Sequence, residues 1–169
     1  MTEQEISPQS TKANHVRVRF LLQPSQDGWP PVDNEGLWGI PLTEGELVQV
    51  DNIPWFARNV AVGDIVRVST SNNGTLWAME KVSWSGACTI RVIPFPDGPL
   101  AGSRQAVLDV FSPLGVDGEG IEQFGMVALS VPPNVNLHEV KRLLHRGESE
   151  GWWEYEEGCI GDAWESIKI

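Results

Sequence analysis

The sequence predicts an α+β protein in which a β-rich half over residues 15–86, an antiparallel barrel or rolled sheet, packs on a ferredoxin-like half over residues 87–169. Two observations predict this fold. Short strand patterns, about ten residues apart and separated by turn residues, fill the first half. After Gly86, strand and helix patterns alternate in the order β-α-β-α-β, which is typical of a split β-α-β unit. We expect one compact unit, preceded by a disordered tail over residues 1–14.

The β-rich half begins with an alternating pattern over residues 16–22, in which every second side chain is apolar. A period of two is typical of a strand with one buried face. Further strand segments follow within 37–50. The clearest turn is Asn-Asn-Gly at 72–74, because Asn-Gly accepts the positive φ of a tight hairpin. It predicts a hairpin between strands at 65–69 and 76–82.

In the second half, the pattern of apolar residues predicts three strands and two helices. The expected bounds are 89–95, 126–131 and 152–156 for the strands and about 103–111 for the first helix. The second helix begins after Asn136, an N-cap residue with Glu139 as its capping-box partner. It is expected to stop at Gly147, because glycine is the usual residue at a helix C-terminus.

Charge and cysteine content exclude several classes of function. The chain has 12 Lys and Arg against 23 Asp and Glu, and this net charge of -11 disfavours direct contact with nucleic-acid phosphates. No apolar segment reaches the roughly 20 residues that span a bilayer, and the N-terminus lacks the apolar core of a secretory signal. With only Cys88 and Cys159 as thiols, we expect a reduced, cytoplasmic protein with no disulfide, metal site or cofactor, and no membrane partner.

Several uncommon strings occur together in one order. They are DGWPPV (27–32), EGLW (35–38), DNIPWFARNVAVGDIVRV (51–68), TIRVIPFPDGPLAGSRQAVLDVFSPLGVDGEG (89–120), FGMVALSVPP (124–133) and WEYEEGC (153–159). Over residues 15–165 the chain resembles a bacterial family known as domain of unknown function 4265. By pattern and charge, the C-terminal half is also similar to the ribonuclease E inhibitors, small acidic proteins with a ferredoxin-like fold. Neither resemblance implies a catalytic residue.

The most acidic part of the chain lies near its C-terminus. Residues 148–165 hold seven acids and no Lys or Arg, with Trp and Tyr between them. Acidic surfaces steer association with basic partners, and Trp and Tyr are frequent anchors of interfaces. The candidate partner-binding residues here are Glu148, Glu150, Trp152, Glu154, Glu156 and Glu157. The alternative interpretation is a solvated strand whose aromatic residues face the core. Because side chains alternate along a strand, Trp153 and Tyr155 should share the buried face, and Trp152 should be the exposed anchor beside Glu154 and Glu156.

A second acidic stretch, residues 27–51, contains Trp29 and Trp38, which we also assign to partner binding. The stiff Gly-Trp-Pro-Pro loop can present an indole, although Pro and Trp also pack together to close a sheet edge. An alternative site is a cleft lined by Asp51, Trp55 and Arg58, in which Arg58 can instead pair with a nearby acid.

No residue is predicted to be catalytic. The strings HExxH, CxxC and GxSxG are absent, and the acidic turn at 117–120 has too few ligands for a calcium loop. The first hypothesis is therefore a non-enzymatic acidic protein that inhibits or neutralises a basic protein, such as a toxin or nuclease. The second is a small-ligand-binding protein or hydrolase-like enzyme with a site between the halves, using Asp51, Arg58, Glu154 and Glu156. A third is a structural module of a larger assembly.

Overall fold

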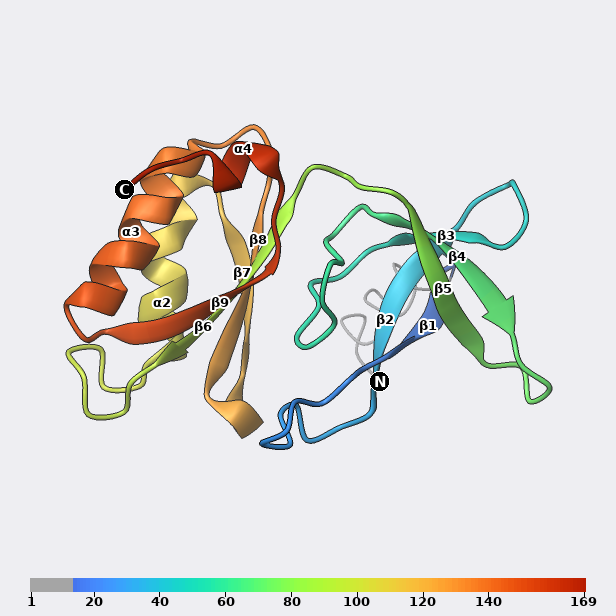
Figure 1. Ribbon diagram of the computed structural model, residues 1–169, viewed down its shortest axis with the longest axis horizontal. Helices are drawn as coiled ribbons and strands as arrows, with labels where there is room; N and C mark the ends of the chain where they lie inside the picture. Colours follow the sequence, from blue (N-terminus) through green and yellow to red (C-terminus); the bar gives the residue numbers. More distant parts are fainter. Residues whose placement is uncertain (1–13) are drawn as a thin grey trace, which may run out of the picture. The chain divides into compact units, whose positions relative to one another are not determined.

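The computed structural model describes residues 14–169, so the expected tail lies, apart from Asn14, outside the described residues. The chain forms two compact units (Figure 1). The first contains residues 14–52 and Gly63–Ser83, and the second contains Ile53–Val62 and Trp84–Ile169. The chain therefore enters the second unit at Ile53, returns to the first at Gly63 and enters the second again at Trp84.

The first unit is a closed five-stranded barrel, as the sequence predicts. Its strands are β1 (Val16–Leu21), β2 (Asn34–Pro41), β3 (Leu47–Val50), β4 (Ile65–Thr70) and β5 (Leu76–Ser83). Neighbouring strands pair antiparallel, and a short parallel pairing of β1 with β5 closes the barrel.

Alternation along the strands fills the interior of the barrel. On β1, Val18 and Phe20 are buried, and Val18 pairs with the buried Leu37 of β2. The predicted hairpin of β4 and β5 is confirmed, with Gly74 at a positive φ of 85° in its turn. Because successive strand residues point to opposite faces, Arg17 and Arg19 lie on the outer wall.

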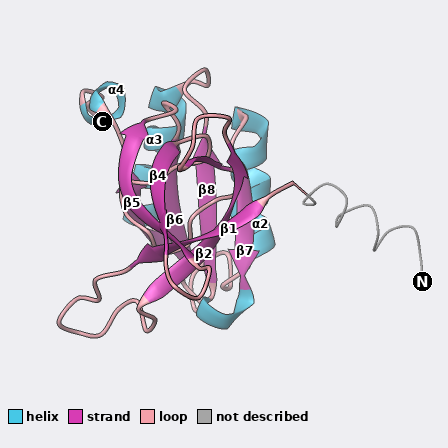
Figure 2. Ribbon diagram, turned by 90° about the vertical axis from the view of Figure 1, so that its right-hand side faces the viewer, coloured by secondary structure: helices cyan, strands magenta, loops and turns pink. Residues whose placement is uncertain are grey.

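The second unit is a four-stranded antiparallel sheet with helices. Its elements are β6 (Cys88–Pro94), α2 (Arg104–Phe111), β7 (Asp117–Ile121), β8 (Met126–Val131), α3 (Leu137–Ser149), β9 (Trp153–Cys159) and α4 (Asp162–Glu165), with short 3-10 helices at Ser112–Leu114 and Glu122–Phe124. The strand order β7-β8-β6-β9 and the sequence β-α-β-β-α-β are those of a ferredoxin-like sheet. Within the described chain, all α-helices belong to this unit (Figure 2).

The helices cover one face of this sheet and form the main core with it. Val107 and Phe111 of α2 and Val140 and Leu144 of α3 pack in one buried cluster with alternate residues of β6, β8 and β9. The N-cap prediction for α3 is confirmed, because the Glu139 amide donates to the side chain of Asn136 over 3.1 Å.

Two sequence predictions for this unit are wrong. The turn expected at 117–120 is part of β7, a strand that the sequence pattern did not predict. It pairs with β8 along its whole length. Helix α3 does not stop at Gly147 but continues to Ser149. Gly147 serves packing instead, since a Cβ there would lie 2.2 Å from Cε2 of Trp153.

Candidate functional site

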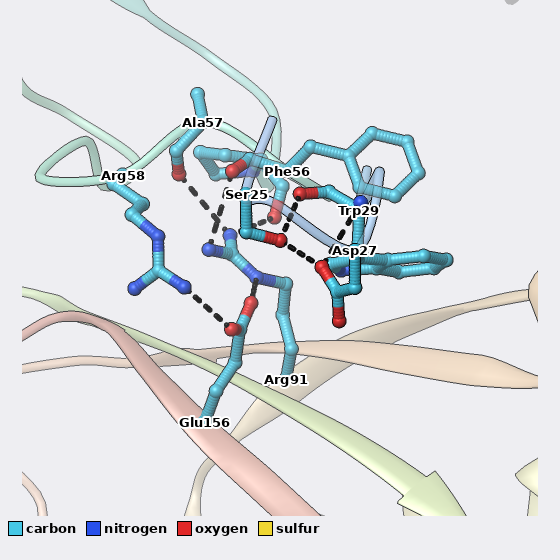
Figure 3. A network of polar contacts seen from close by, with 9 residues as sticks. Ser25, Asp27, Trp29, Phe56, Ala57, Arg58, Arg91 and Glu156 are labelled. Atoms are coloured by element: carbon cyan, nitrogen blue, oxygen red, sulfur yellow. Dashed lines mark hydrogen bonds and ion pairs between the residues drawn. The ribbon is translucent and has the colours of Figure 1, made fainter. Parts of the chain in front are cut away.

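The densest polar network of the second unit is centred on Arg91 in β6 (Figure 3). The side chain lies on the face of the sheet opposite the main core and is only 1% exposed. Its Nε donates to Oε1 of Glu156 over 2.5 Å. Its Nη1 donates to the carbonyl oxygens of Ala57 (3.2 Å) and Pro54 (3.4 Å), and Nη2 donates to that of Phe56 (3.4 Å). A buried cation is therefore held by one carboxylate and three peptide dipoles.

Arg91 thereby fixes the segment Ile53–Val62 on the sheet. The same segment accepts a 2.8 Å bond from the Thr89 hydroxyl at the Val60 carbonyl, and the Asn59 amide donates to Gly158 over 2.8 Å. Gly158 is needed here because a Cβ would lie 2.6 Å from Nη2 of Arg91. The irregular segment thus satisfies its backbone polar groups on the sheet rather than in an element of its own.

Arg58 and Glu156 are brought together by this network. Nη2 of Arg58 donates to the second carboxylate oxygen, Oε2 of Glu156, over 3.0 Å. Glu156 therefore bridges a buried and an exposed guanidinium, and its negative charge is neutralised within the unit (Figure 3). Trp55 is half-buried in the same segment, and the neighbouring Phe56 packs edge-to-face on Phe124 at 5.3 Å. The geometry gives Arg58 and Glu156 a role in holding the segment.

The acids of the C-terminal run have different environments. Glu157 is exposed, but it accepts a hydrogen bond from the Trp164 indole of the same unit. Glu150 is exposed and pairs with Arg146 one turn earlier on α3, at 3.2 Å. Glu148 and Glu154 are exposed, and neither has a cationic partner among the described residues.

The two tryptophans at this corner also differ. Trp153 is fully buried, as predicted; its Nε1 donates to the Leu144 carbonyl over 3.1 Å, and its ring lies 5.6 Å from that of Phe111. Trp152 precedes the first residue of β9 and is half-buried, so the fully exposed anchor that we expected is not observed. Its ring packs edge-to-face on Trp153 and lies 5.3 Å from the Arg146 guanidinium.

The acids occupy both faces of β9, which is an edge strand of its sheet. Glu154 and Glu156 lie on the face of Arg91, as strand alternation predicts. Tyr155 lies on the opposite face, where burial, reinforced by the charges of Glu148 and Glu157, raises its pKa to about 12. A partner at this edge would therefore meet negative charge on either side of the strand.

The remaining candidates lie in the first unit. Trp29 is half-buried in the loop before β2, where the Ser25 hydroxyl donates to Asp27 and the Trp29 amide approaches the same carboxylate (Figure 3). These bonds lower the pKa of Asp27, the Ser25 bond most strongly. Trp38 lies on β2 beneath the Arg17 guanidinium at 5.1 Å. Asp51 contacts His15 Nε2 at 2.5 Å in this unit, whereas Arg58 belongs to the second unit.

Among residues 14–169 the structure shows no metal-binding cluster, and both thiols are buried. Over residues 14–169 there is no cluster of three His, Cys, Asp or Glu side chains that could hold a metal ion. Cys88 and Cys159 are both buried as free thiols. Burial, with a contribution from Cys159, raises the pKa of Cys88 to about 11, so this thiol stays protonated at neutral pH.

Together these features define a class of protein: an α+β protein with a five-stranded barrel and a ferredoxin-like sheet, whose second face is covered by an irregular segment held by a buried arginine. The chain belongs to the family described as Domain of unknown function (DUF4265), whose model matches residues 35–155.

A solved structure supports the fold. The chain is similar to a hypothetical protein from Neisseria gonorrhoeae, with 20% sequence identity and a TM-score of 0.70, over 87% of this chain and 97% of that one. No curated protein matches the sequence. In the part of the chain that the structure describes, none of the helices is long and apolar enough to cross a membrane.

Proposed function

We propose that this protein is a non-enzymatic acidic binding protein that neutralises a basic protein partner, such as a toxin or nuclease. The observation that carries the proposal is a pair of exposed acids, Glu154 of the edge strand β9 and Glu148 near the end of α3, which have no cationic partner among the described residues. Unneutralised charge at the rim of a surface accelerates encounter with an oppositely charged protein and selects against like-charged ones.

Three further features support this site. The net charge of -11 extends the negative field beyond the edge strand. Trp152 is half-buried at the start of the strand and held by Arg146 and Trp153, so it offers a large, pre-ordered apolar surface. The backbone of an edge strand also has one side free of sheet partners, which permits strand addition by a partner.

The geometry narrows the set of residues in this proposal. Glu148, Glu150, Trp152 and Glu154 form the proposed binding edge. Glu156 and Glu157 are left out because Arg91, Arg58 and Trp164 already engage them. We place the interaction with the basic partner in the cytoplasm, where the two thiols of the chain stay reduced.

The test compares two double variants of the full chain as baits in a native lysate. Glu148→Gln with Glu154→Gln removes the charge of the proposed binding edge. Asp117→Asn with Glu122→Gln removes two exposed acids in and just after β7, the opposite edge strand of the same sheet, and is the matched control. A basic protein captured by the wild type and the control, but lost with the edge variant, would support the proposal. Equal capture by all three, or capture of acidic proteins only, would overturn it.

A further inference from the structure

The outer wall of the barrel carries an unusual pair of cations, Arg17 and Arg19 of β1. The first unit has two other described cations, and each has a carboxylate partner: Arg67 with Glu80 at 2.9 Å and Lys81 with Asp64 at 3.3 Å. Over residues 14–169, no carboxylate lies within ion-pair distance of Arg17 or Arg19. In a chain with 23 acids, this local excess of positive charge needs a reason.

The two guanidiniums are close to each other. Gly36 of β2 lies directly opposite Arg19, and a Cβ at Gly36 would be 2.6 Å from Arg17 Nε and 2.9 Å from Arg19 Nη1. The two nitrogens are therefore at most about 5.5 Å apart, which is the sum of those two distances. Like charges at this distance repel, and an oxyanion placed between them would accept hydrogen bonds from both.

Indole rings flank the pair on the neighbouring strands. Trp38 of β2 pairs with Arg17, whose guanidinium lies 5.1 Å from the centre of its ring. Trp77 of β5 pairs with Arg19, and like Trp38 it is half-buried on the outer wall. Flat aromatic faces beside paired guanidiniums are suited to a ligand that joins an anion to a planar ring.

A shallow, open hollow of about 730 Å³ borders Arg19 on this wall of the barrel. Arg19 and Asn34 border it, and Arg19 Nη1 donates to Oδ1 of Asn34 over 3.3 Å, which orients the guanidinium. Asp33 also borders the hollow and accepts a 2.8 Å bond from the Asn34 amide. Because the Asp33 carboxylate repels anions, a ligand with a single charged end would bind with that end at Arg17 and Arg19. Its uncharged part would lie away from the two guanidiniums.

We propose that Arg17, Arg19 and Trp77 form a binding site for a free nucleotide, with the phosphate between the two guanidiniums and the base against the indole. The net charge of -11 favours a small ligand with one or two phosphates over a nucleic-acid strand, because the repulsion grows with every further phosphate. This site lies in the first unit and is independent of the proposed binding edge in the second.

The test is calorimetric titration of the full chain with adenosine monophosphate, ribose 5-phosphate and a dT10 oligonucleotide. We expect saturable binding of the nucleotide, weaker binding of ribose 5-phosphate and weaker binding still of the oligonucleotide per phosphate. Arg17→Gln and Arg19→Gln should each weaken nucleotide binding by about tenfold or more, since each removes a charge-assisted hydrogen bond. Trp77→Leu should weaken binding of the nucleotide but leave ribose 5-phosphate unchanged.

The matched control is Arg142→Gln, an exposed arginine of α3 that pairs with Glu139 in the other unit. It should bind the nucleotide as the wild type does. The inference is overturned if binding does not saturate up to about 10 mM nucleotide. That result would mean a binding free energy weaker than about -3 kcal/mol. It is equally overturned if neither arginine variant weakens binding, or if the oligonucleotide binds more tightly per phosphate than the free nucleotide.

Discussion

Arg91 holds a full positive charge at a position that is 1% exposed, and its partners are fixed by the fold. Arg91→Met would remove the donor of the hydrogen bonds to Oε1 of Glu156 and to the carbonyl oxygens of Pro54, Phe56 and Ala57. We expect the free energy of unfolding to fall by about 3–5 kcal/mol, as when one partner of a buried ion pair is removed. Urea denaturation followed by tryptophan fluorescence measures this loss.

Arg58→Met is the control for that experiment, because it removes the exposed partner of the same carboxylate. The Arg58 side chain is 65% exposed, so water replaces its contact and the loss should stay below about 1 kcal/mol. Equal losses of unfolding free energy in the two variants would contradict the idea that Arg91 stabilises the protein because it is buried.

Trp153 and Trp152 are neighbours in sequence with different roles. Trp153→Ala should destabilise the protein by about 3–5 kcal/mol, because it empties a fully buried aromatic site and frees the Leu144 carbonyl. Trp152→Ala should cost about 1–2 kcal/mol, since the ring is only half-buried. Guanidinium denaturation of both variants gives the comparison, and a larger loss for Trp152 would contradict this assignment.

Cys88 makes stability dependent on alkaline pH. Its pKa is about 11 in the folded protein against 9.0 for an ordinary thiol, so the unfolded chain releases the proton first. Stability should therefore be constant with respect to this group below pH 9 and fall as the pH rises towards 11. The measurement is the melting temperature between about pH 8 and 11. Both proteins compared carry Tyr155→Phe, which removes the second alkaline titration. The melting temperature should fall less steeply in the one that also carries Cys88→Ala.

Single residues were predictable where a local pattern determines their environment. Alternation along 152–156 was enough to predict that Trp153 and Tyr155 share a face and that Trp153 is buried. It could not show that Glu156 faces an arginine 65 residues earlier, so a structural carboxylate was assigned to a binding surface. Arg91 was missed, although a lone charge inside the apolar run 90–95 is a sign of a buried cation.

At the scale of elements, β7 shows how tertiary pairing overrides local propensity. Its sequence, Asp-Gly-Glu-Gly-Ile, is typical of a turn because Gly and Asp are rare in strands. It forms a strand because β8 offers a partner for every one of its residues. The hairpin at 72–74 was predictable for the opposite reason, since its turn residues determine the local backbone without help from distant contacts.

Gly118 in β7 is packed closely by its neighbours. A Cβ there would lie 2.7 Å from Cδ2 of Leu108 and 2.8 Å from Cδ2 of Leu129, so Gly118→Ala must displace one or both side chains. We expect a loss of about 1–3 kcal/mol, the usual cost of overpacking. Gly120→Ala is the matched control on the same strand, because its Cβ would approach only the Arg104 side chain, at 3.3 Å. Equilibrium unfolding of both variants is the measurement, and indistinguishable losses would contradict the argument.

The segment Ile53–Val62 is the element that sequence could not assign. It has neither a strand nor a helix period, and its hydrogen bonds go to β6 and β9, far away in the chain. By contrast, the barrel and the ferredoxin-like sheet follow from turn chemistry and from the alternation of strands and helices, and both are confirmed.

At the scale of the whole molecule, the charge of -11 should govern how fast a basic partner is met. For a partner captured at the proposed binding edge, the association rate constant should fall markedly between about 20 and 150 mM salt, because the Debye length shortens to about 8 Å. The dissociation rate constant should change little. Surface plasmon resonance at several salt concentrations measures both, and an association rate that does not depend on salt would contradict electrostatic steering.

The path of the chain through the two units limits how this protein can be divided. Because Ile53–Val62 lies in the second unit while both its flanks lie in the first, no single cleavage of the polypeptide yields two complete modules. A gene fragment encoding only residues 84–169 would produce a sheet whose buried Arg91 lacks three of its carbonyl acceptors. A simple end-to-end fusion could therefore not transfer either unit, complete and alone, to another protein.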